Sequence, residues 1–188
     1  MPPKQAKQKP IITHTKQVAK TRIFEVEELD LEFSNGEKRT FERLVAGANG
    51  AVMIVAILDN EFLLLIREYS AGTHDYQLAF PKGLMESGET VEQAANRELM
   101  EEVGFGANKF TVMKQMTLAP GYLTHRMNLL FAESLYEEKR QGDEPEELEV
   151  VKWRLDELDK LIEQPDFTEA RSVAALFLAQ KIIQSKIK

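Results

Sequence analysis

The chain has 188 residues, 43% of them hydrophobic and 29% charged, and carries a net charge of −7, a composition typical of one globular domain. It contains no cysteine, which excludes disulfide bonds and thiolate metal sites. No apolar run approaches the ~18 residues of a membrane-spanning helix, and the N-terminal segment lacks the apolar core of a secretory signal. We therefore expect a cytoplasmic protein without a membrane partner.

The N-terminal segment differs in charge from the rest of the chain. Residues 1–21 carry five lysines and no acidic residue, and we expect them to form a flexible basic tail. A nucleic-acid-binding arm is the alternative interpretation. It is disfavoured because the segment lacks interleaved aromatic residues and because the acidic body would repel a polyphosphate backbone. No nucleic-acid partner is expected.

The pattern of strands begins at Arg22. Residues 22–33 and 39–45 alternate apolar and polar side chains around Asn35-Gly36, which is a strong hairpin signal. The hairpin over 22–45 is therefore predicted as an N-terminal extension, free to pack on its own core or on a partner subunit. Two buried-strand runs follow at 51–58 and 62–66, and a further strand is predicted at 75–80.

The sequence GLMESGETVEQAANRELMEEVGF, residues 83–105, predicts a loop followed by a helix. Gly83 and Gly88 keep the loop irregular, and Thr90 with Gln93 forms a capping box that starts the helix. Gly104 is the expected stop. An apolar stripe faces the core, formed by Ala94, Ala95, Leu99 and Val103.

The rest of the chain contains three more predicted strands and two helices. The strands are expected at 110–118, 127–133 and 148–153, and the helices near 155–163 and 168–186. No internal repeat or linker divides this part of the chain. Strands on both sides of a central helix indicate an α+β fold.

Three glutamates, Glu98, Glu101 and Glu102, share one surface of the central helix. Like charges at these spacings cost about 0.2–0.5 kcal/mol per pair, and the C-terminal half of a helix disfavours acids. A solvated acidic face is one interpretation. In the other interpretation, Arg97, water or a bound cation offsets the repulsion between the carboxylates. Glu89 and the loop carbonyls are expected in the same region, and oxygen ligands in that number suit magnesium or manganese.

The complete spacing resembles the Nudix box. A glycine is followed after five residues by glutamate, after seven by Arg-Glu-Leu, and then by Glu-Glu and Gly-Phe. The resemblance implies the Nudix fold, an α/β/α sandwich with a mixed sheet between helices, over residues 46–188. The motif positions are Gly83, Glu89, Arg97, Glu98, Glu101, Glu102 and Gly104.

The resemblance also implies metal-dependent hydrolysis of a nucleoside diphosphate linked to another group. The expected ion is Mg²⁺, with Mn²⁺ possible. By this resemblance Glu98 and Glu102 are direct metal ligands, Glu101 assists directly or through water, and the backbone near Lys82 and Gly83 offers a carbonyl oxygen. Arg97 is placed among the catalytic residues because it can pair with Glu101 and hold the carboxylates in register.

The flanking segments carry a second resemblance, in the stretches 22–36, 63–84, 142–153 and 166–179 together with the box. By these stretches, from about Arg22 to the last helix, the chain is similar to bacterial ADP-compound hydrolases. Pro120 and Tyr122, after the box, imply a range of ADP-containing substrates: ADP-ribose, NADH and diadenosine polyphosphates. Glu144 and Glu146 fall on an acidic segment that is either a solvated loop or, by the resemblance, a loop that supplies a catalytic base or a further metal ligand. The general base lies in this loop or in the box.

The resemblance further implies a homodimer formed through the N-terminal hairpin. Phe24 or Arg22 would then stack on or bind the adenosine in the partner's pocket, whereas for Phe24 the alternative is ordinary hairpin packing. Arg67 either binds phosphate or pairs with a neighbouring acid. Two other functions remain open: a pyrophosphohydrolase for RNA ends or oxidised nucleotides, and a non-catalytic module that binds ADP-ribose.

Overall fold

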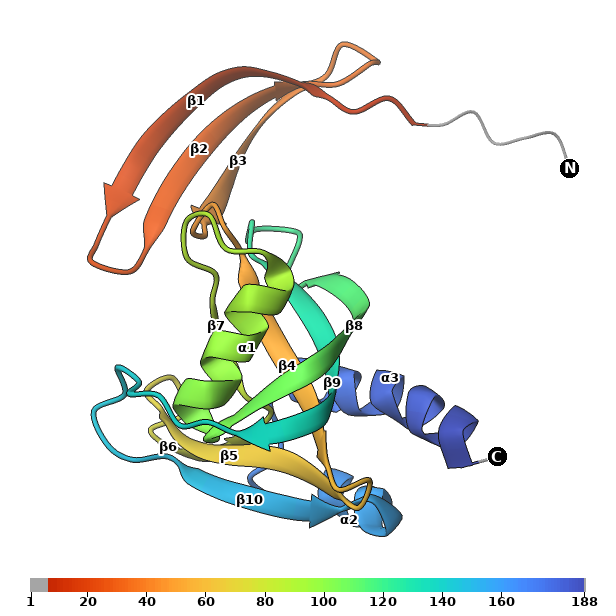
Figure 1. Cartoon of the computed structure of the whole chain (residues 1–188). Helices are drawn as coiled ribbons and strands as arrows, with labels where there is room; N and C mark the ends of the chain where they lie inside the picture. The colour runs from red at the N-terminus through yellow and green to blue at the C-terminus, as the bar shows by residue number, and fades with distance from the viewer. Residues whose placement is uncertain (1–6, 188) are drawn as a thin grey trace, which may run out of the picture. The chain divides into compact units, whose positions relative to one another are not determined.

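The computed structural model describes residues 7–187, with side-chain surroundings for residues 7–184, and divides the chain into two compact units (Figure 1). Residues up to 48 and residues 117–125 form the N-terminal unit, and residues 49–116 and 126 onward form the main unit.

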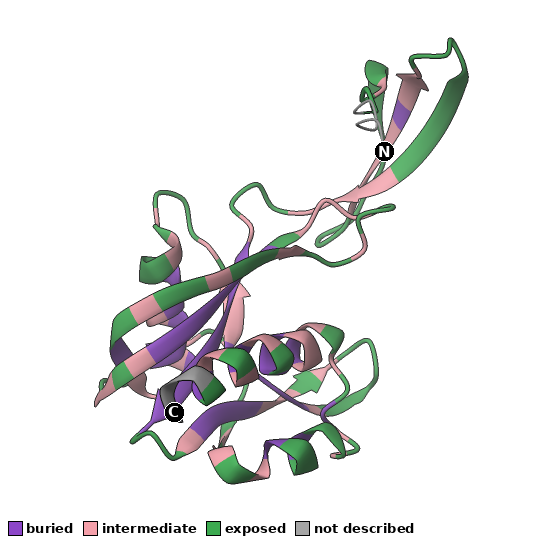
Figure 2. Ribbon diagram, turned by 90° about the vertical axis from the view of Figure 1, so that its right-hand side faces the viewer, coloured by how far each residue is buried: buried purple, intermediate pink, exposed green. Residues whose placement is uncertain are grey.

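The N-terminal unit is built on an antiparallel sheet of three strands. β1 (Ile11–Lys20), β2 (Glu25–Glu32) and β3 (Lys38–Val45) pair in the order β1-β2-β3. The predicted turn between β2 and β3 is confirmed, because Gly36 has a φ of 82° and the Asn35 side chain accepts a hydrogen bond from the Glu37 amide at 3.1 Å. Leu29 is buried, whereas the apolar side chains Ile11, Ile12 and Val18 of β1 and Phe41 of β3 are exposed, and the exposed stretches are green in Figure 2.

The prediction of a flexible tail over residues 1–21 is wrong for residues 11–20, which form β1. The lysines of this segment lie opposite acids of β2. Lys16 faces Glu28 in the register, and Lys20 forms an ion pair with Glu25 at 3.4 Å. Cross-strand pairs of opposite charge stabilise a sheet, so the lysines support a strand rather than solvate a tail. Residues 1–6 of the predicted tail lie outside the described residues.

A second chain segment completes the N-terminal unit. The Leu44 amide donates to the Tyr122 carbonyl at 2.7 Å, and the Thr124 amide donates back to the Leu44 carbonyl at 3.1 Å. The Ala46 amide also donates to the Thr124 hydroxyl at 2.8 Å. These bonds attach residues 117–125 to the end of β3.

The main unit contains a mixed sheet of seven strands. Its main path is β10-β5-β4-β9-β8, with β6 paired to β5 and β7 paired to β4. β4 is parallel to β9 and antiparallel to β5 and β7. The bounds are β4 (Ala51–Leu58), β5 (Phe62–Ser70), β6 (Asp75–Ala79), β7 (Lys82–Leu84), β8 (Phe105–Thr117), β9 (Arg126–Glu137) and β10 (Glu149–Arg154).

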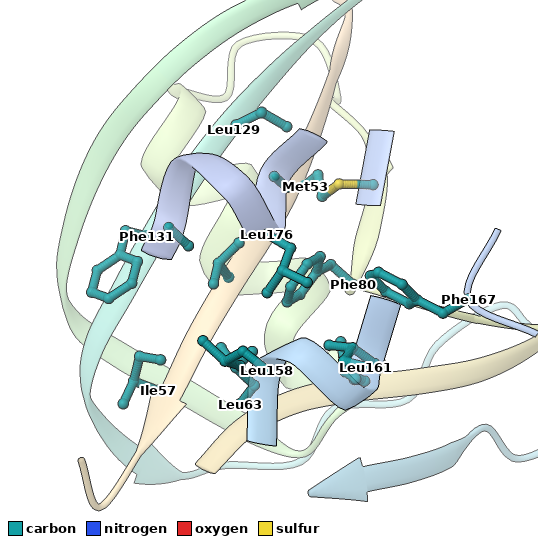
Figure 3. Packing of buried hydrophobic residues seen from close by; sticks show 14 of the residues in the cluster. Met53, Ile57, Leu63, Phe80, Leu129, Phe131, Leu158, Leu161, Phe167 and Leu176 are labelled. Atoms are coloured by element: carbon teal, nitrogen blue, oxygen red, sulfur yellow. The ribbon is translucent and has the colours of Figure 1, made fainter. Parts of the chain in front are cut away.

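Helices cover both faces of this sheet. α1 (Val91–Glu102) packs on one face, and the short turn η1 (Leu155–Glu157), α2 (Leu158–Ile162) and α3 (Ala170–Ile187) lie on the other. Alternate residues of β4 serve the two faces: Met53 packs with Leu161 and Leu176 (Figure 3), whereas Ile54 packs with Leu99. Because both sides are apolar, all of β4 is buried. The predicted α/β/α sandwich is confirmed.

Two elements differ from the expected ones. Residues 82–84, predicted as loop, form the short strand β7 against β4. β8 begins at Phe105 rather than near residue 110, because Gly104, with a φ of 81°, ends the helix and turns the chain directly into the sheet. Among the helices described over residues 7–187, none is long and apolar enough to cross a lipid bilayer.

Glu169 stabilises the start of α3 through its side-chain carboxylate. Its carboxylate accepts hydrogen bonds from the Ser172 amide at 2.8 Å and hydroxyl at 2.9 Å, and it pairs with Arg171. Burial raises its pKa, but the hydrogen bond and charge of Arg171 together with Ser172 outweigh this, so the net pKa is lowered. A lowered pKa means that the ionised carboxylate stabilises the fold above the unfolded pKa of about 4.5.

We therefore expect Glu169→Gln to lower the free energy of unfolding by about 1 kcal/mol near pH 7. The difference should shrink as the pH falls through the folded pKa of Glu169, because the natural carboxyl is then protonated as well. Urea unfolding near pH 7 and near pH 3 measures this. Glu163→Gln, at an exposed position after α2, is the control; equal losses at both pH values would contradict the charge-based account.

Candidate active site

The position of the glutamates is set by the two ends of α1. The capping box is confirmed: the Thr90 hydroxyl accepts from the Gln93 amide at 3.2 Å, and the Gln93 side chain accepts from the Thr90 amide at 2.9 Å. Leu99 is fully buried against the sheet. With the core face fixed in this way, Glu98, Glu101 and Glu102 all line one cavity.

Arg97 is the cation that offsets part of the repulsion between these acids. Its guanidinium donates to Glu89 at 2.8 and 3.1 Å, to Glu98 at 2.8 Å and to Glu101 at 2.9 Å. A further bond at 2.9 Å reaches the Leu84 carbonyl. The hydrogen bond from Arg97 lowers the pKa of Glu89, and the same acids raise the pKa of Arg97. The predicted pairing of Arg97 with Glu101 is confirmed.

Glu98 and Glu102 are buried carboxylates, with relative exposures of 8% and 3%. Glu102 accepts a hydrogen bond from the Lys82 amide at 2.9 Å. Burial raises the pKa of Glu98 despite its contact with Arg97, and burial raises the pKa of Glu102 well above its usual range. Two acids whose charged form is disfavoured by their surroundings are typical of a functional site rather than of a solvated helix face.

Gly83 allows the Glu98 carboxylate to approach the backbone of β7. A Cβ atom at this position would lie 2.1 Å from the carboxylate carbon and from one of its oxygens. The prediction that Gly83 keeps a loop irregular is therefore wrong, because the residue pairs with Val52 in the sheet and its missing side chain makes room for Glu98. Gly88 does lie in the loop, with a φ of 88°.

The acids surround a cavity of about 600 Å³ between the end of β5, β7, the C-terminal half of α1 and residues 141–145. Among the side chains described over residues 7–184, the cationic ones that line it are Lys82 and Arg97. Lys82 reaches Glu68 with its Nζ at 2.6 Å, an ion pair that the sequence did not predict. The acidic lining comprises Glu68, Glu86, Glu98, Glu101, Glu102, Asp143 and Glu144.

The donor set suits a divalent cation. Carboxylate oxygens are the ligands that Mg²⁺ and Mn²⁺ prefer, and a bound cation would offset the cost of burying charged Glu98 and Glu102. Among the side chains described over residues 7–184, no three acidic or histidine groups already surround one point as metal ligands would. Arg97 is the charge partner that Glu98 and Glu101 share in this structure.

The structure separates the two acids of the predicted catalytic loop. Glu144 is half-buried, lines the cavity and acts on Glu98 through its charge. Glu146 is exposed, is absent from the cavity lining, and accepts a hydrogen bond from the Tyr76 hydroxyl at 2.7 Å. Of these two predicted acids, Glu144 therefore lines the cavity of the box glutamates and Glu146 does not.

The other residues predicted to bind substrate are not among those that line this cavity. Arg67 pairs with Glu149 at 2.6 Å and Asp166 at 3.0 Å, which is the second of its two interpretations. Arg22, Phe24 and Tyr122 belong to the N-terminal unit, so their contact with substrate stays a prediction.

One signal for the missed Glu68 is present in the sequence. It follows Leu64 and Ile66 at two-residue spacing, and in a strand such residues share one face of the sheet. Leu64 and Ile66 both pack on the face of the sheet that α1 covers. Glu68, two residues further along the strand, therefore belongs to the same face as the box glutamates.

Comparison with known proteins agrees with this geometry. A model of the NudE-type Nudix hydrolase N-terminal domain matches residues 10–43, and a model of the NUDIX domain matches residues 48–177. The chain belongs to the Nudix family. It is 51% identical to "ADP compounds hydrolase NudE" of Escherichia coli (strain K12), over 95% of this chain and 96% of that protein.

Two further relatives support the assignment. An "ADP-ribose pyrophosphatase" of Bacillus subtilis (strain 168) is 31% identical over 86% of this chain and 90% of its own length. A crystal structure of an ADP compounds hydrolase superposes with a TM-score of 0.90 at 50% identity, covering 97% of this chain and 98% of that one. The chain is thus a Nudix hydrolase, and Nudix hydrolases generally need a divalent metal ion.

Proposed function

We propose that this Nudix hydrolase cleaves the pyrophosphate bond of ADP-linked compounds in the cytoplasm. The products are AMP and the linked group carrying the other phosphate, such as ribose 5-phosphate from ADP-ribose. ADP-ribose, NADH and diadenosine polyphosphates are the proposed substrates. The observation that carries the proposal is the pair of buried carboxylates, Glu98 and Glu102, packed against Gly83 and the Lys82 amide in an acidic cavity. The full set of box acids argues against a module that only binds ADP-ribose.

The proposed metal is Mg²⁺, with Mn²⁺ as a substitute. Glu98 and Glu102 would hold it, Glu101 would assist directly or through water, and the backbone near Lys82 and Gly83 would add a carbonyl oxygen. When bound, the ion neutralises the diphosphate and makes an attacking water more acidic. Oxygen-rich sites bind both ions, so comparing the rate of hydrolysis with Mg²⁺ and with Mn²⁺ tells which one the enzyme prefers.

The side chains of the cavity have separate tasks in this proposal. Arg97 holds Glu98 and Glu101 in register, since it contacts both carboxylates. Lys82 adds a positive charge beside the acidic lining, which repels phosphate, and Glu68 holds its ammonium group in place. Glu144 or Glu101 accepts the proton of the attacking water, a role that requires a carboxylate within reach of the reacting atoms.

We also propose a homodimer formed through the N-terminal sheet. This sheet and its β1–β2 turn expose large apolar side chains, with relative exposures of 68% for Ile11 and 45% for Phe41 in the strands and 72% for Ile23 and 53% for Phe24 in the turn. A three-stranded sheet with so little buried surface gains stability from a partner. Phe24 or Arg22 would then contact the adenosine, with Tyr122 as a further substrate contact. A monomeric mass by light scattering at micromolar concentration would overturn the dimer.

The test of the function is product analysis with ADP-ribose and magnesium. The natural chain should release AMP and ribose 5-phosphate in equal amounts, and chelation of the metal should stop the reaction. NADH and diadenosine polyphosphates are assayed in parallel to rank the substrates. Absence of AMP from all three, with hydrolysis of RNA 5′ ends or oxidised nucleotides instead, would sink the proposal.

A further inference from the structure

We propose that Tyr76 is a positioning residue that holds the loop of residues 141–148 through Glu146, so that Glu144 is the acid presented to the reacting atoms. This inference rests on the proposed hydrolysis and assigns different tasks to the two loop acids. Glu146 would act as the attachment point of the loop, whereas Glu144 would act in the cavity.

The start of the loop is fixed to the C-terminal end of α1. The Glu138 amide donates to the Gly104 carbonyl at 3.1 Å, and the Arg140 amide donates to the Met100 carbonyl at 3.1 Å. The Lys139 ammonium donates to the Glu101 carbonyl at 2.9 Å. The Met100 and Glu101 carbonyls are among those that a helix end leaves without partners in the helix, and Gly104 directly follows this end. The segment entering the loop therefore moves with the helix that carries the box glutamates.

The far end of the loop is fixed to the sheet. Glu149 is the first residue of β10, lies opposite Arg67 of β5 in the register, and forms an ion pair with it at 2.6 Å. Figure 1 shows the loop running from the end of β9 to β10 beside β6. The stretch between these two ends contains both acids, so its path decides which of them enters the cavity.

The Tyr76 hydroxyl fixes that path between the two ends. It donates to Glu146 at 2.7 Å, across 70 residues of sequence. Pro145 separates Glu146 from Glu144, and its ring restricts the backbone between them. Holding the Glu146 side chain on β6 thus limits where Glu144 can lie, and Glu144 lines the cavity beside the box acids.

The Tyr76 ring is itself held in place. Tyr69 lies opposite it in the β5–β6 register, and the two rings meet edge to face with centroids 5.9 Å apart. The Tyr69 hydroxyl is engaged separately, at 2.7 Å from Nδ1 of His74. The hydrogen bond to Glu146 raises the pKa of Tyr76 from its usual value of about 10, in keeping with a phenol that donates to a carboxylate. Tyr69 has the same chemistry at the neighbouring position without a bond to the loop.

This pair of tyrosines provides the experiment. Tyr76→Phe and Glu146→Ala are each expected to lower kcat about 3- to 10-fold with ADP-ribose, as the loss of one hydrogen bond at a surface predicts. KM and the pH profile should stay unchanged, because neither residue is placed in contact with substrate. The double variant should be no slower than either single variant, since both remove the same interaction. Tyr69→Phe should match the natural chain.

Glu144→Gln is expected to lower kcat at least about 100-fold, the loss typical of a group that acts at the reacting atoms. A comparable loss in Glu146→Ala, with Tyr76→Phe unaffected, would overturn the proposal and make Glu146 catalytic. Independent, additive losses from Tyr76 and Glu146 would overturn it too.

Hydrogen exchange separates this inference from the proposed substrate. The amides of residues 141–148 should exchange faster in Tyr76→Phe than in the natural chain and in Tyr69→Phe, whether or not ADP-ribose is turned over. Unchanged exchange in Tyr76→Phe would refute the attachment even in an active enzyme. Conversely, faster exchange in a protein that releases no AMP would refute the proposed function alone.

Discussion

Glu102→Gln is expected to reduce hydrolysis at least about 100-fold while leaving the metal-free protein no less stable than the natural chain. Glu102 is 3% exposed, and burial raises its pKa well above the usual range. A raised pKa means that the folded state binds the proton more tightly than the unfolded state. The ionised form therefore lowers stability as the pH rises from the unfolded pKa of about 4.5 through the folded pKa.

A neutral glutamine removes this cost at neutral pH and keeps an oxygen that can accept from the Lys82 amide. Its gain in stability over the natural chain should disappear at pH values below about 4.5, where both side chains are uncharged. Kinetics, thermal unfolding with and without Mg²⁺, and a direct binding isotherm with Mn²⁺ measure the separate effects. The Tm increase caused by the metal should also be lost.

Glu92→Gln on the same helix is the matched control, since Glu92 is an exposed acid of the first turn. It should keep activity, metal binding and stability near those of the natural chain. A Glu102→Gln protein that unfolds at a much lower Tm would show that Glu102 is structural, and one that retains full activity would remove it from the metal site.

Gly83→Ala is expected to reduce activity about 100-fold with little loss of stability. The added Cβ would meet the end of the Glu98 side chain at 2.1 Å and no backbone atom among its three nearest neighbours. A flexible carboxylate can rotate away, so the fold tolerates the change. The displaced carboxylate, however, leaves the place that it shares with Glu102 in the cavity, and a displacement of about 1 Å at a catalytic centre is enough for such a loss.

Gly72→Ala is the matched control, because a Cβ at Gly72 would have no neighbour within 4 Å. Comparison of kcat/KM, Mn²⁺ affinity and urea unfolding for the two alanine variants separates the site from the fold. A Gly83→Ala protein with natural activity would contradict the close packing of Glu98 on β7. A protein that fails to fold would instead place Gly83 among the residues required by the sheet.

The sequence predicts those elements that are determined by residues close together in the chain. β4 was found because both of its faces are apolar, and α1 because Thr90, Gln93 and Gly104 mark its ends within one short segment. The role of Arg97 was also predictable, since its partner Glu101 lies one helical turn away. These features depend on residues close to one another in the chain.

The missed features depend on contacts between distant segments. The lysines of residues 11–20 predict a tail when considered alone, and only the pairing with β2 places acids opposite them. The need for glycine at position 83 comes from the Glu98 carboxylate, fifteen positions later in the sequence, so local reasoning predicts only a loop there. Glu144 and Glu146 are equivalent by sequence, and the hydrogen bond from Tyr76 to Glu146, across 70 residues, distinguishes them.

The N-terminal unit is not a contiguous piece of the gene product. It is assembled from residues up to 48 and residues 117–125, and the second segment lies inside the region that the NUDIX domain model matches. A ribosome must therefore synthesise Tyr122 and Thr124 before the Leu44 backbone finds its hydrogen-bond partners. For the same reason, cutting the chain at residue 48 would not yield two self-sufficient domains, and swapping the first 48 residues between relatives would require exchange of residues 117–125 as well.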